Sequence, residues 1–158
     1  MILYHGSNQQ VITPDLLRSR PGKDFGQAFY LSEDRHQAEE MADFKVKTFG
    51  GQIEVSTFQF DETLLKDGRL KFLKFESYTR EWADFILANR SLKEGGSIHD
   101  FDIVYGPIAN DRIGRQILNL QAGYIDFDMF LKKIQYPEGI TFQWAFCTEK
   151  ALQILQRI

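Results

Sequence analysis

Apolar positions recur along this chain with two different periods, and each change of period marks a new element. Short apolar runs bounded by Gly, Asn, Asp or Pro predict strands over residues 2–5, 29–31, 52–60, 69–75, 101–107 and 140–148. Apolar spacing of three to four residues predicts helices over residues 33–48, 77–90, 110–120, 127–134 and 148–158. The irregular alternation of the two patterns indicates an α+β arrangement rather than a helical bundle or a β-sandwich. A length of 158 residues predicts a single domain, residues 1–158.

Polar residues at the ends of these runs predict how the elements begin and end. Ser32 is expected to cap the first long helix with its hydroxyl group, and Gly50 and Gly51 are expected to end that helix. The last strand alternates two faces. One face carries Phe142, Trp144 and Phe146, and the other carries Gln143, Ala145 and Cys147.

Composition narrows the classes of function. A hydrophobic content of 43% and a net charge of -3 describe a globular protein without the basic excess typical of extended nucleic-acid binding. No apolar run approaches the roughly eighteen residues of a membrane span, and the first residues do not resemble a secretory leader. One cysteine cannot form an intramolecular disulfide. We therefore expect a cytoplasmic protein with no membrane partner.

Two possible catalytic motifs lose their support from context. Asp24, Phe25 and Gly26 form the tripeptide that binds metal in protein kinases, but no Gly-rich loop, strand lysine or H-R-D segment precedes it. Cys147 has no His and Asp partners in a recognisable pattern, so a packed thiol is expected. His36 and His99 lack the spacing of metal ligands, so no metal site is predicted.

Four segments together carry a resemblance to a known superfamily. They are "LYHGS" at residues 3–7, "DFGQAFYLS" at 24–32, "FDIVYGPIANDR" at 101–112 and "TFQWAFCT" at 141–148. The set resembles the ADP-ribosyltransferase superfamily, in its branch of diphtheria toxin and poly-ADP-ribose polymerases, and more closely a short bacterial family within it. The resemblance implies split, mixed β-sheets with flanking helices around an NAD cleft.

The resemblance also implies a reaction and a site. Such enzymes cleave the nicotinamide-ribose bond of NAD through an oxocarbenium-like transition state and transfer ADP-ribose to a protein or nucleic-acid acceptor. It assigns His5 to an adenosine-ribose hydroxyl, the Gly6 backbone to the nicotinamide amide, and Tyr30 to the nicotinamide ring. Ser7 follows Gly6 at the end of the first predicted strand and is included in the predicted NAD site. Gln143 completes the catalytic set of His5, Tyr30 and Gln143.

Further residues enter the predicted NAD site by position. Asp24, Phe25 and Gly26 lie in the loop before Tyr30, and Met41 takes the place of a second ring against the nicotinamide. A basic cluster before Asp24 either contacts the pyrophosphate of NAD or is a solvated loop. It contains Arg18, Arg20 and Lys23. Asn89 and Arg90, at the end of a predicted helix, either have a structural role or contact a ligand phosphate or an acceptor.

Gln143 stands where the classical transferases have a glutamate, and a neutral amide supplies no negative charge to an oxocarbenium ion. The carboxylates considered as substitutes are Asp102, Asp111, Glu138 and Glu149. In a transferase-type cleft, replacing Gln143 with Glu is expected to raise nicotinamide release. Three functions stay open: a transferase acting as a toxin or effector with a small antitoxin, a silent module that binds NAD, ADP-ribose or a protein partner, and an NAD glycohydrolase.

Overall fold

Two β-sheets form the centre of the protein in the computed structural model, which describes residues 1–135 and 139–158. The first sheet has the order β1-β3-β7, with both pairs antiparallel. The second has the order β2-β6-β5-β4, in which only β4 and β5 are parallel. The strands are β1 (Ile2–Ser7), β2 (Phe29–Leu31), β3 (Glu54–Gln59), β4 (Phe72–Lys74), β5 (Ile103–Pro107), β6 (Phe142–Phe146) and β7 (Gln156–Arg157).

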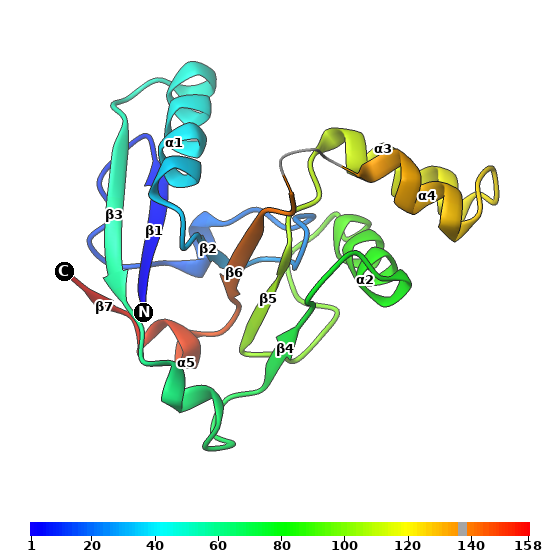
Figure 1. Ribbon diagram of the computed structural model, residues 1–158. Helices are drawn as coiled ribbons and strands as arrows, with labels where there is room; N and C mark the ends of the chain where they lie inside the picture. The colour runs from blue at the N-terminus through cyan, green and yellow to red at the C-terminus, as the bar shows by residue number, and fades with distance from the viewer. Residues whose placement is uncertain (136–138) are drawn as a thin grey trace.

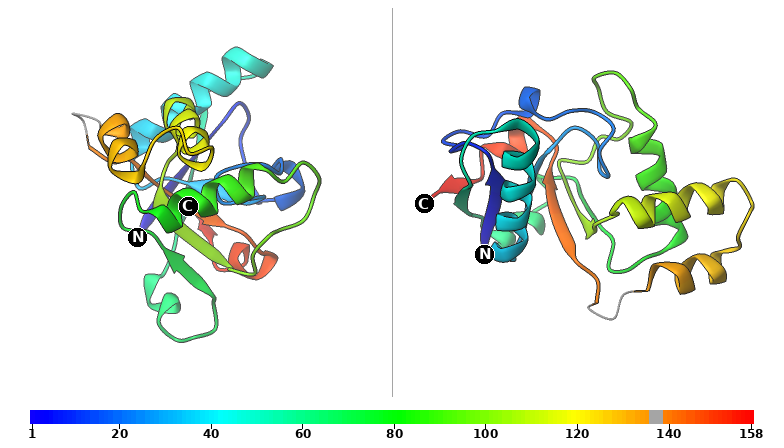
Figure 2. Two further views of the ribbon diagram at one scale, coloured as in Figure 1. Left: turned by 90° about the vertical axis from the view of Figure 1, so that its right-hand side faces the viewer. Right: turned by 90° about the horizontal axis from the view of Figure 1, so that it is seen from above.

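The helices divide between the two sheets. Helix α1 (Arg35–Phe49) packs on β1 and β3, while the helices after β4 gather on the far side of the second sheet (Figure 1). Those are α2 (Arg80–Arg90), α3 (Asp111–Gln121) and α4 (Phe127–Ile134). Figure 2 shows α3 and α4 side by side, away from the first sheet. A short α5 (Glu149–Leu152) and the 3-10 turns Leu16–Arg18 and Glu62–Leu65 complete the elements, and the predicted α+β class is confirmed.

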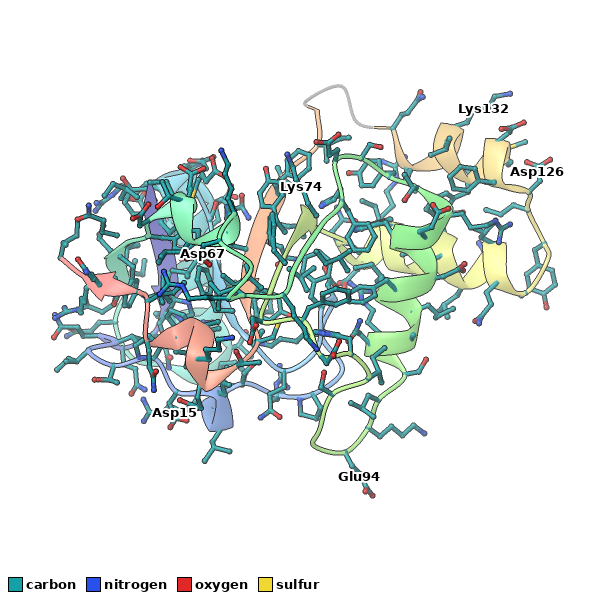
Figure 3. All side chains as sticks on the ribbon, turned by 90° about the horizontal axis from the view of Figure 1, so that it is seen from below. Asp15, Asp67, Lys74, Glu94, Asp126 and Lys132 are labelled. Atoms are coloured by element: carbon teal, nitrogen blue, oxygen red, sulfur yellow. The ribbon has the colours of Figure 1, made fainter. Side chains whose placement is uncertain are left out.

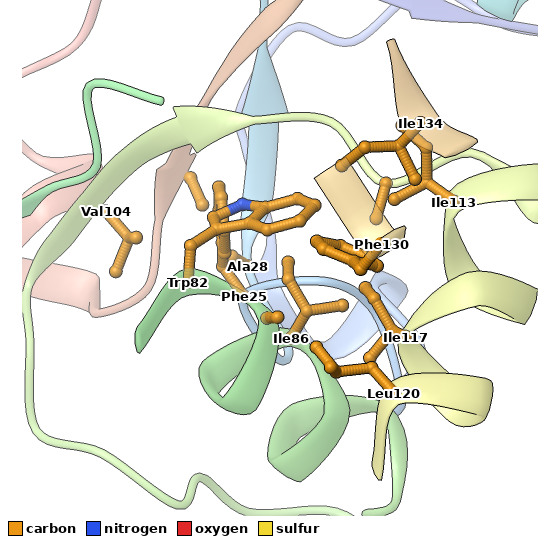
Figure 4. Packing of buried hydrophobic residues seen from close by; sticks show 13 residues of the cluster. Phe25, Ala28, Trp82, Ile86, Val104, Ile113, Ile117, Leu120, Phe130 and Ile134 are labelled. Atoms are coloured by element: carbon orange, nitrogen blue, oxygen red, sulfur yellow. The ribbon is translucent and has the colours of Figure 1, made fainter. Parts of the chain in front are cut away.

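Each face of the second sheet covers its own hydrophobic core. Leu3 and Phe58 of the first sheet meet Trp144 and Phe146 of β6 between the two sheets. On the other face, Ala145 joins a core built with α2, α3 and α4, part of which is seen in Figure 4. The residues labelled there include Phe25, Trp82, Ile86, Ile117 and Phe130. Because side chains alternate along β6, Gln143 lies on the same face as Ala145.

The start of α1 differs from the prediction. The Asp34 carboxylate, rather than the Ser32 hydroxyl, caps the helix by accepting from His36 N at 2.9 Å. Ser32 Oγ instead accepts from Asp34 N at 2.9 Å, just before the helix begins. Gly50 ends the helix as expected, with a φ of 76°.

The predicted final helix is wrong beyond Leu152. There the chain turns and adds β7 to the free edge of β3, pairing Phe58 with Arg157. Ile158 N also donates to Thr57 O at 3.1 Å. An unpaired strand edge offers backbone partners to any adjacent segment, and this tertiary pairing overrides the helical spacing of Leu152, Leu155 and Ile158. In the described ranges, no helix is long and apolar enough to cross a membrane.

Candidate functional site

His5 is a half-buried side chain on β1 whose hydrogen bonding defines its tautomer. Its ring stacks on Phe29 at a centroid distance of 4.3 Å, and Nδ1 lies 2.7 Å from the Tyr30 carbonyl oxygen. A carbonyl only accepts, so Nδ1 carries the hydrogen. Burial, together with the charge of Lys45, lowers the pKa of His5 to about 3. The ring is therefore neutral at pH 7, and Nε2 is an acceptor suited to a hydroxyl donor.

The backbone N–H and C=O groups of Gly6 point to the side of β1 opposite β3. Tyr4 exchanges both of its backbone hydrogen bonds with Ser32, which follows β2, at 2.8 and 2.9 Å. Because hydrogen-bonding direction alternates along a strand, Gly6 faces the same way two residues later. Its carbonyl accepts from Lys45 Nζ at 2.7 Å. The junction of the two sheets therefore carries a backbone amide group directed towards α1 and Lys45.

The absence of a side chain at Gly6 has a structural cause of its own. A Cβ there would lie 1.8 Å from the Ala38 carbonyl oxygen, so only glycine lets α1 approach β1 this closely. Ser7 follows it as a buried residue paired with Glu54 of β3. Both residues have a role in the first sheet that does not depend on a ligand.

The Tyr30 hydroxyl is held by two hydrogen bonds to the backbone. The hydroxyl donates to Gly26 O at 2.7 Å and accepts from Phe25 N at 3.1 Å. Burial raises the pKa of Tyr30 well above its ordinary value, so the phenol is neutral. Lys23 Nζ lies 5.1 Å from the ring centroid. The ring face is thus already a site for positive charge.

Asp24 is the centre of the hydrogen-bond network beside Tyr30. Asp24 is 9% exposed, and its carboxylate accepts from Arg90 Nε at 2.8 Å, with Arg90 Nη2 in ion-pair contact at 2.7 Å. It also accepts from Ala109 N at 2.9 Å and from Gln143 Nε2 at 3.0 Å. This buried carboxylate joins the loop before β2 to α2, to the segment after β5, and to β6.

The Asp24 contact orients the Gln143 side chain. A carboxylate accepts from the amide NH₂ and not from the amide oxygen, so the contact assigns Nε2 to Asp24. Oε1 is then directed away from Asp24 as an acceptor. Sequence reasoning sought a carboxylate near Gln143 but missed Asp24, because 119 positions separate the two residues.

The other carboxylates considered do not share this position. Asp102 accepts from Lys71 N and from the Thr148 hydroxyl at 2.8 and 2.6 Å, which ties β4 to the end of β6. Asp111 and Glu149 lie in the first turns of α3 and α5. Glu138 lies outside the described residues.

Two candidate ligand contacts are internal contacts instead. Arg90 has the structural role that was the alternative to phosphate binding, because its guanidinium pairs with Asp24 and donates to the Ala109 carbonyl. Phe25 has no exposed surface and packs in the core against Phe75 and Phe85, so its side chain offers nothing to a ligand. Its sequence position beside Asp24 gave no sign of this burial.

Gly26 is required by the turn that holds Tyr30. Its φ is 88°, a conformation that glycine adopts readily. A Cβ would come within 2.9 Å of Oδ1 of the buried Asn89. Gly26 thus positions the carbonyl that accepts from Tyr30, and its part in the site is through the backbone.

Met41 lies on the stripe of α1 that borders the junction of the sheets. One turn before it, Gln37 Nε2 donates to Phe142 O of β6 at 3.4 Å, and one turn after it Lys45 bonds Gly6. Met41 is 50% exposed between these two contacts. The stripe therefore contacts β6 at Gln37 and β1 at Lys45.

Lys23 and Lys45 connect the two parts of the site electrostatically. Burial and the charge of Lys23 lower the pKa of Lys45 to about 8. The pKa of Lys23 is lowered by burial and by Arg20, against the opposing effect of Asp24. Both lysines lower the pKa of His5, and Asp24 raises that of Lys23. His5, Lys45, Lys23 and Asp24 therefore interact electrostatically. Lys45 belongs to no recognisable motif, and the sequence did not reveal it.

The remaining chemical candidates stay outside the site. Burial, followed by the charge of Asp102, raises the pKa of the Cys147 thiol to about 12, which leaves no thiolate nucleophile at neutral pH. In the part of the chain that the structure describes, no three His, Cys, Asp or Glu side chains are placed to hold a metal ion.

Comparison with known proteins gives one result on family membership. No curated protein matches the chain. A family model does match, over residues 1–157, and its description is "Protein of unknown function (DUF3990)". A match of this length covers nearly every element described above, so the chain belongs to the DUF3990 family.

Proposed function

We propose that this protein is an NAD-using enzyme of the ADP-ribosyltransferase type, which cleaves the nicotinamide-ribose bond and transfers ADP-ribose to an acceptor. The two sheets would then be the split sheets of that superfamily, with NAD bound at their junction. The support is the arrangement of four residues in space. His5 and Gly6 of β1, Tyr30 of β2 and Gln143 of β6 come from distant parts of the chain and lie around that junction.

The first two groups fit the parts of NAD assigned to them. His5 Nε2 is an unprotonated acceptor and matches a ribose hydroxyl. The Gly6 backbone at the outer side of β1 matches a carboxamide, which both donates and accepts.

The Tyr30 ring fits the reacting end of NAD. Nicotinamide is positively charged while it is attached to ribose, and the face of Tyr30 already attracts the Lys23 ammonium. Release of neutral nicotinamide removes that charge from the ring and with it the cation-π attraction. Tyr30 therefore favours bound NAD over the free leaving group.

The observation that carries the proposal is the hydrogen bond from Gln143 to Asp24. It fixes Oε1 as an acceptor for a ribose hydroxyl, which holds the sugar in the orientation for bond cleavage. If Gln143 takes the position of the classical glutamate, the Asp24 carboxylate is next to that position. Asp24 shares its charge with Arg90, so the negative potential at the ribose is weak. Loss of one preorganised electrostatic contact costs about 10²–10³ in rate, and we expect slow turnover.

The same ion pair favours one alternative, a silent module that binds NAD or ADP-ribose without cleaving it. An Asp24 carboxylate fully compensated by Arg90 would stabilise bound ribose but not an oxocarbenium ion. The acceptor, protein or nucleic acid, and a role as a bacterial toxin with a small antitoxin stay part of the proposal. Water as the acceptor would make the protein an NAD glycohydrolase, which product analysis distinguishes.

The structure changes how the role of Gln143 should be tested. A Gln143→Glu substitution puts a second carboxylate within hydrogen-bond distance of Asp24, and two adjacent carboxylates retain a proton between them. This single variant is therefore not expected to gain activity. The double variant Asp24→Asn/Gln143→Glu restores one amide and one carboxylate, with the negative charge moved onto β6.

The experiment measures nicotinamide release and NAD binding for the wild type, both single variants and the double variant. We expect slow release by the wild type and a rise of about 10² in the double variant over Asp24→Asn alone. If all four proteins bind NAD and leave it intact, the silent module replaces the enzyme. Absence of NAD binding in the folded wild type refutes both.

A further inference from the structure

Lys23 and Lys45 are half-buried, whereas every other lysine in the described residues is exposed. Lys47 pairs with Asp43 at 2.5 Å on the outside of α1, and exposed charges of this kind surround the molecule, as the labelled side chains in Figure 3 illustrate. Among residues 1–135 and 139–158, no carboxylate lies within 4.0 Å of Lys23 or Lys45 Nζ. Both ammonium groups are half-buried.

The charges around these two lysines sum to a positive value in a chain whose net charge is -3. The charge of Lys23 lowers the pKa of Lys45, and Arg20 adds a third positive charge near Lys23. Asp24, whose negative charge opposes the effect of Arg20 on Lys23, already pairs with Arg90. Uncompensated like charges in a half-buried place destabilise a folded protein, and such arrangements are frequent where an anion binds.

We propose that Lys23 and Lys45 bind a phosphate-containing anion across the junction of the two sheets, and that in bound NAD this anion is the pyrophosphate. Lys45 has three N–H donors and uses one on the Gly6 carbonyl. Lys23 reaches the junction from the loop before β2, above the Tyr30 ring. Only the identification with NAD rests on the proposed function. The anion site itself rests on the two lysines.

Calorimetric titration of the full chain tests the site without any turnover. The probes are inorganic pyrophosphate, ADP-ribose, and adenosine, which lacks phosphate. The proteins are the wild type, Lys23→Gln, Lys45→Gln, the charge-preserving Lys45→Arg, and the matched control Lys47→Gln on the exposed side of α1. Circular dichroism confirms that each variant is folded.

We expect each Gln substitution at Lys23 or Lys45 to weaken binding of pyrophosphate and ADP-ribose about tenfold, because each removes a charge-assisted contact. Lys47→Gln should change neither affinity, and Lys45→Arg should retain most of it. Adenosine affinity should be equal in all proteins. Pyrophosphate binding that depends on Lys23 and Lys45 in a protein that does not bind NAD would support the anion site and refute the proposed function.

The opposite results overturn the proposal. If folded Lys23→Gln and Lys45→Gln bind pyrophosphate and ADP-ribose as the wild type does, the lysines are not an anion site. An equal loss in Lys47→Gln would show that only the overall charge matters. NAD cleavage with unchanged affinity in both variants would leave the proposed function standing and the anion site refuted.

Discussion

Removal of the Asp24 side chain is the perturbation whose cost the structure predicts most directly. The carboxylate accepts three hydrogen bonds within 3.0 Å, one of them from Arg90 in an ion pair, and only 9% of Asp24 is exposed. Asp24→Ala leaves the guanidinium without its counter-charge and the Ala109 N–H without an acceptor. Breaking a buried ion pair by removing one partner costs about 3–5 kcal/mol of unfolding free energy.

Urea unfolding of the wild type and Asp24→Ala, followed by tryptophan fluorescence, measures this cost. Trp82 lies in the helix-side core and Trp144 between the sheets, so the signal reports on both cores. The matched control is Asp126→Ala, because Asp126 is an exposed aspartate that caps α4 through Met129 N at 2.7 Å. A lost helix cap costs about 1 kcal/mol. If Asp24→Ala costs no more than Asp126→Ala, the network is not the structural centre inferred here.

Three further predictions follow from individual contacts. Gly6→Ala should lower the unfolding free energy by about 1–3 kcal/mol or more, since its Cβ would collide with the Ala38 carbonyl, whereas Gly95→Ala, which meets no atom within 4 Å, should be nearly neutral in the same urea assay. Tyr30→Phe removes the hydroxyl contacts to the Gly26 and Phe25 backbone, and urea unfolding should show a loss of about 1–2 kcal/mol. The lowered pKa of His5, about 3, means that the unfolded chain binds more protons below pH 6.5, so stability should fall by up to about 1.4 kcal/mol per unit as pH drops from 6.5 towards 3. A His5→Gln variant should lack this part of the acid sensitivity, and identical pH profiles for the two proteins would contradict the neutral, buried ring.

The sequence was sufficient where a local pattern decides the structure. The strand at residues 29–31 and the helices around Trp82, Ile113 and Phe130 were predicted because apolar spacing and caps act within a few residues. The end of the chain was not, because residues 156–157 satisfy the edge of β3, about a hundred positions away. Local helical spacing carries no information about such an edge.

In the candidate site, too, local motifs predict some residues, whereas contacts made by tertiary packing are not predicted. Gly6, Tyr30 and Gln143 belong to motifs and were found by their order in the chain. The Asp24 contacts to Arg90 and Gln143 were not, because they depend on how α2 and β6 pack around the loop before β2. The sequence leaves Asp24 either capping local amides or contacting a ligand, and it gives no sign that Asp24 orients Gln143. Lys45 was missed because a lysine on an amphipathic helix is ordinarily solvated.

The central claim is that the junction of the two sheets binds and cleaves NAD. Its most direct test is nicotinamide release from NAD by the full chain, compared with His5→Ala and Gln143→Ala variants shown to be folded. The account predicts slow, measurable release by the wild type and its loss in both variants, because one removes the acceptor for a ribose hydroxyl and the other the amide that Asp24 orients. Release that persists unchanged in both folded variants, or a wild type that neither binds nor cleaves NAD, would contradict it.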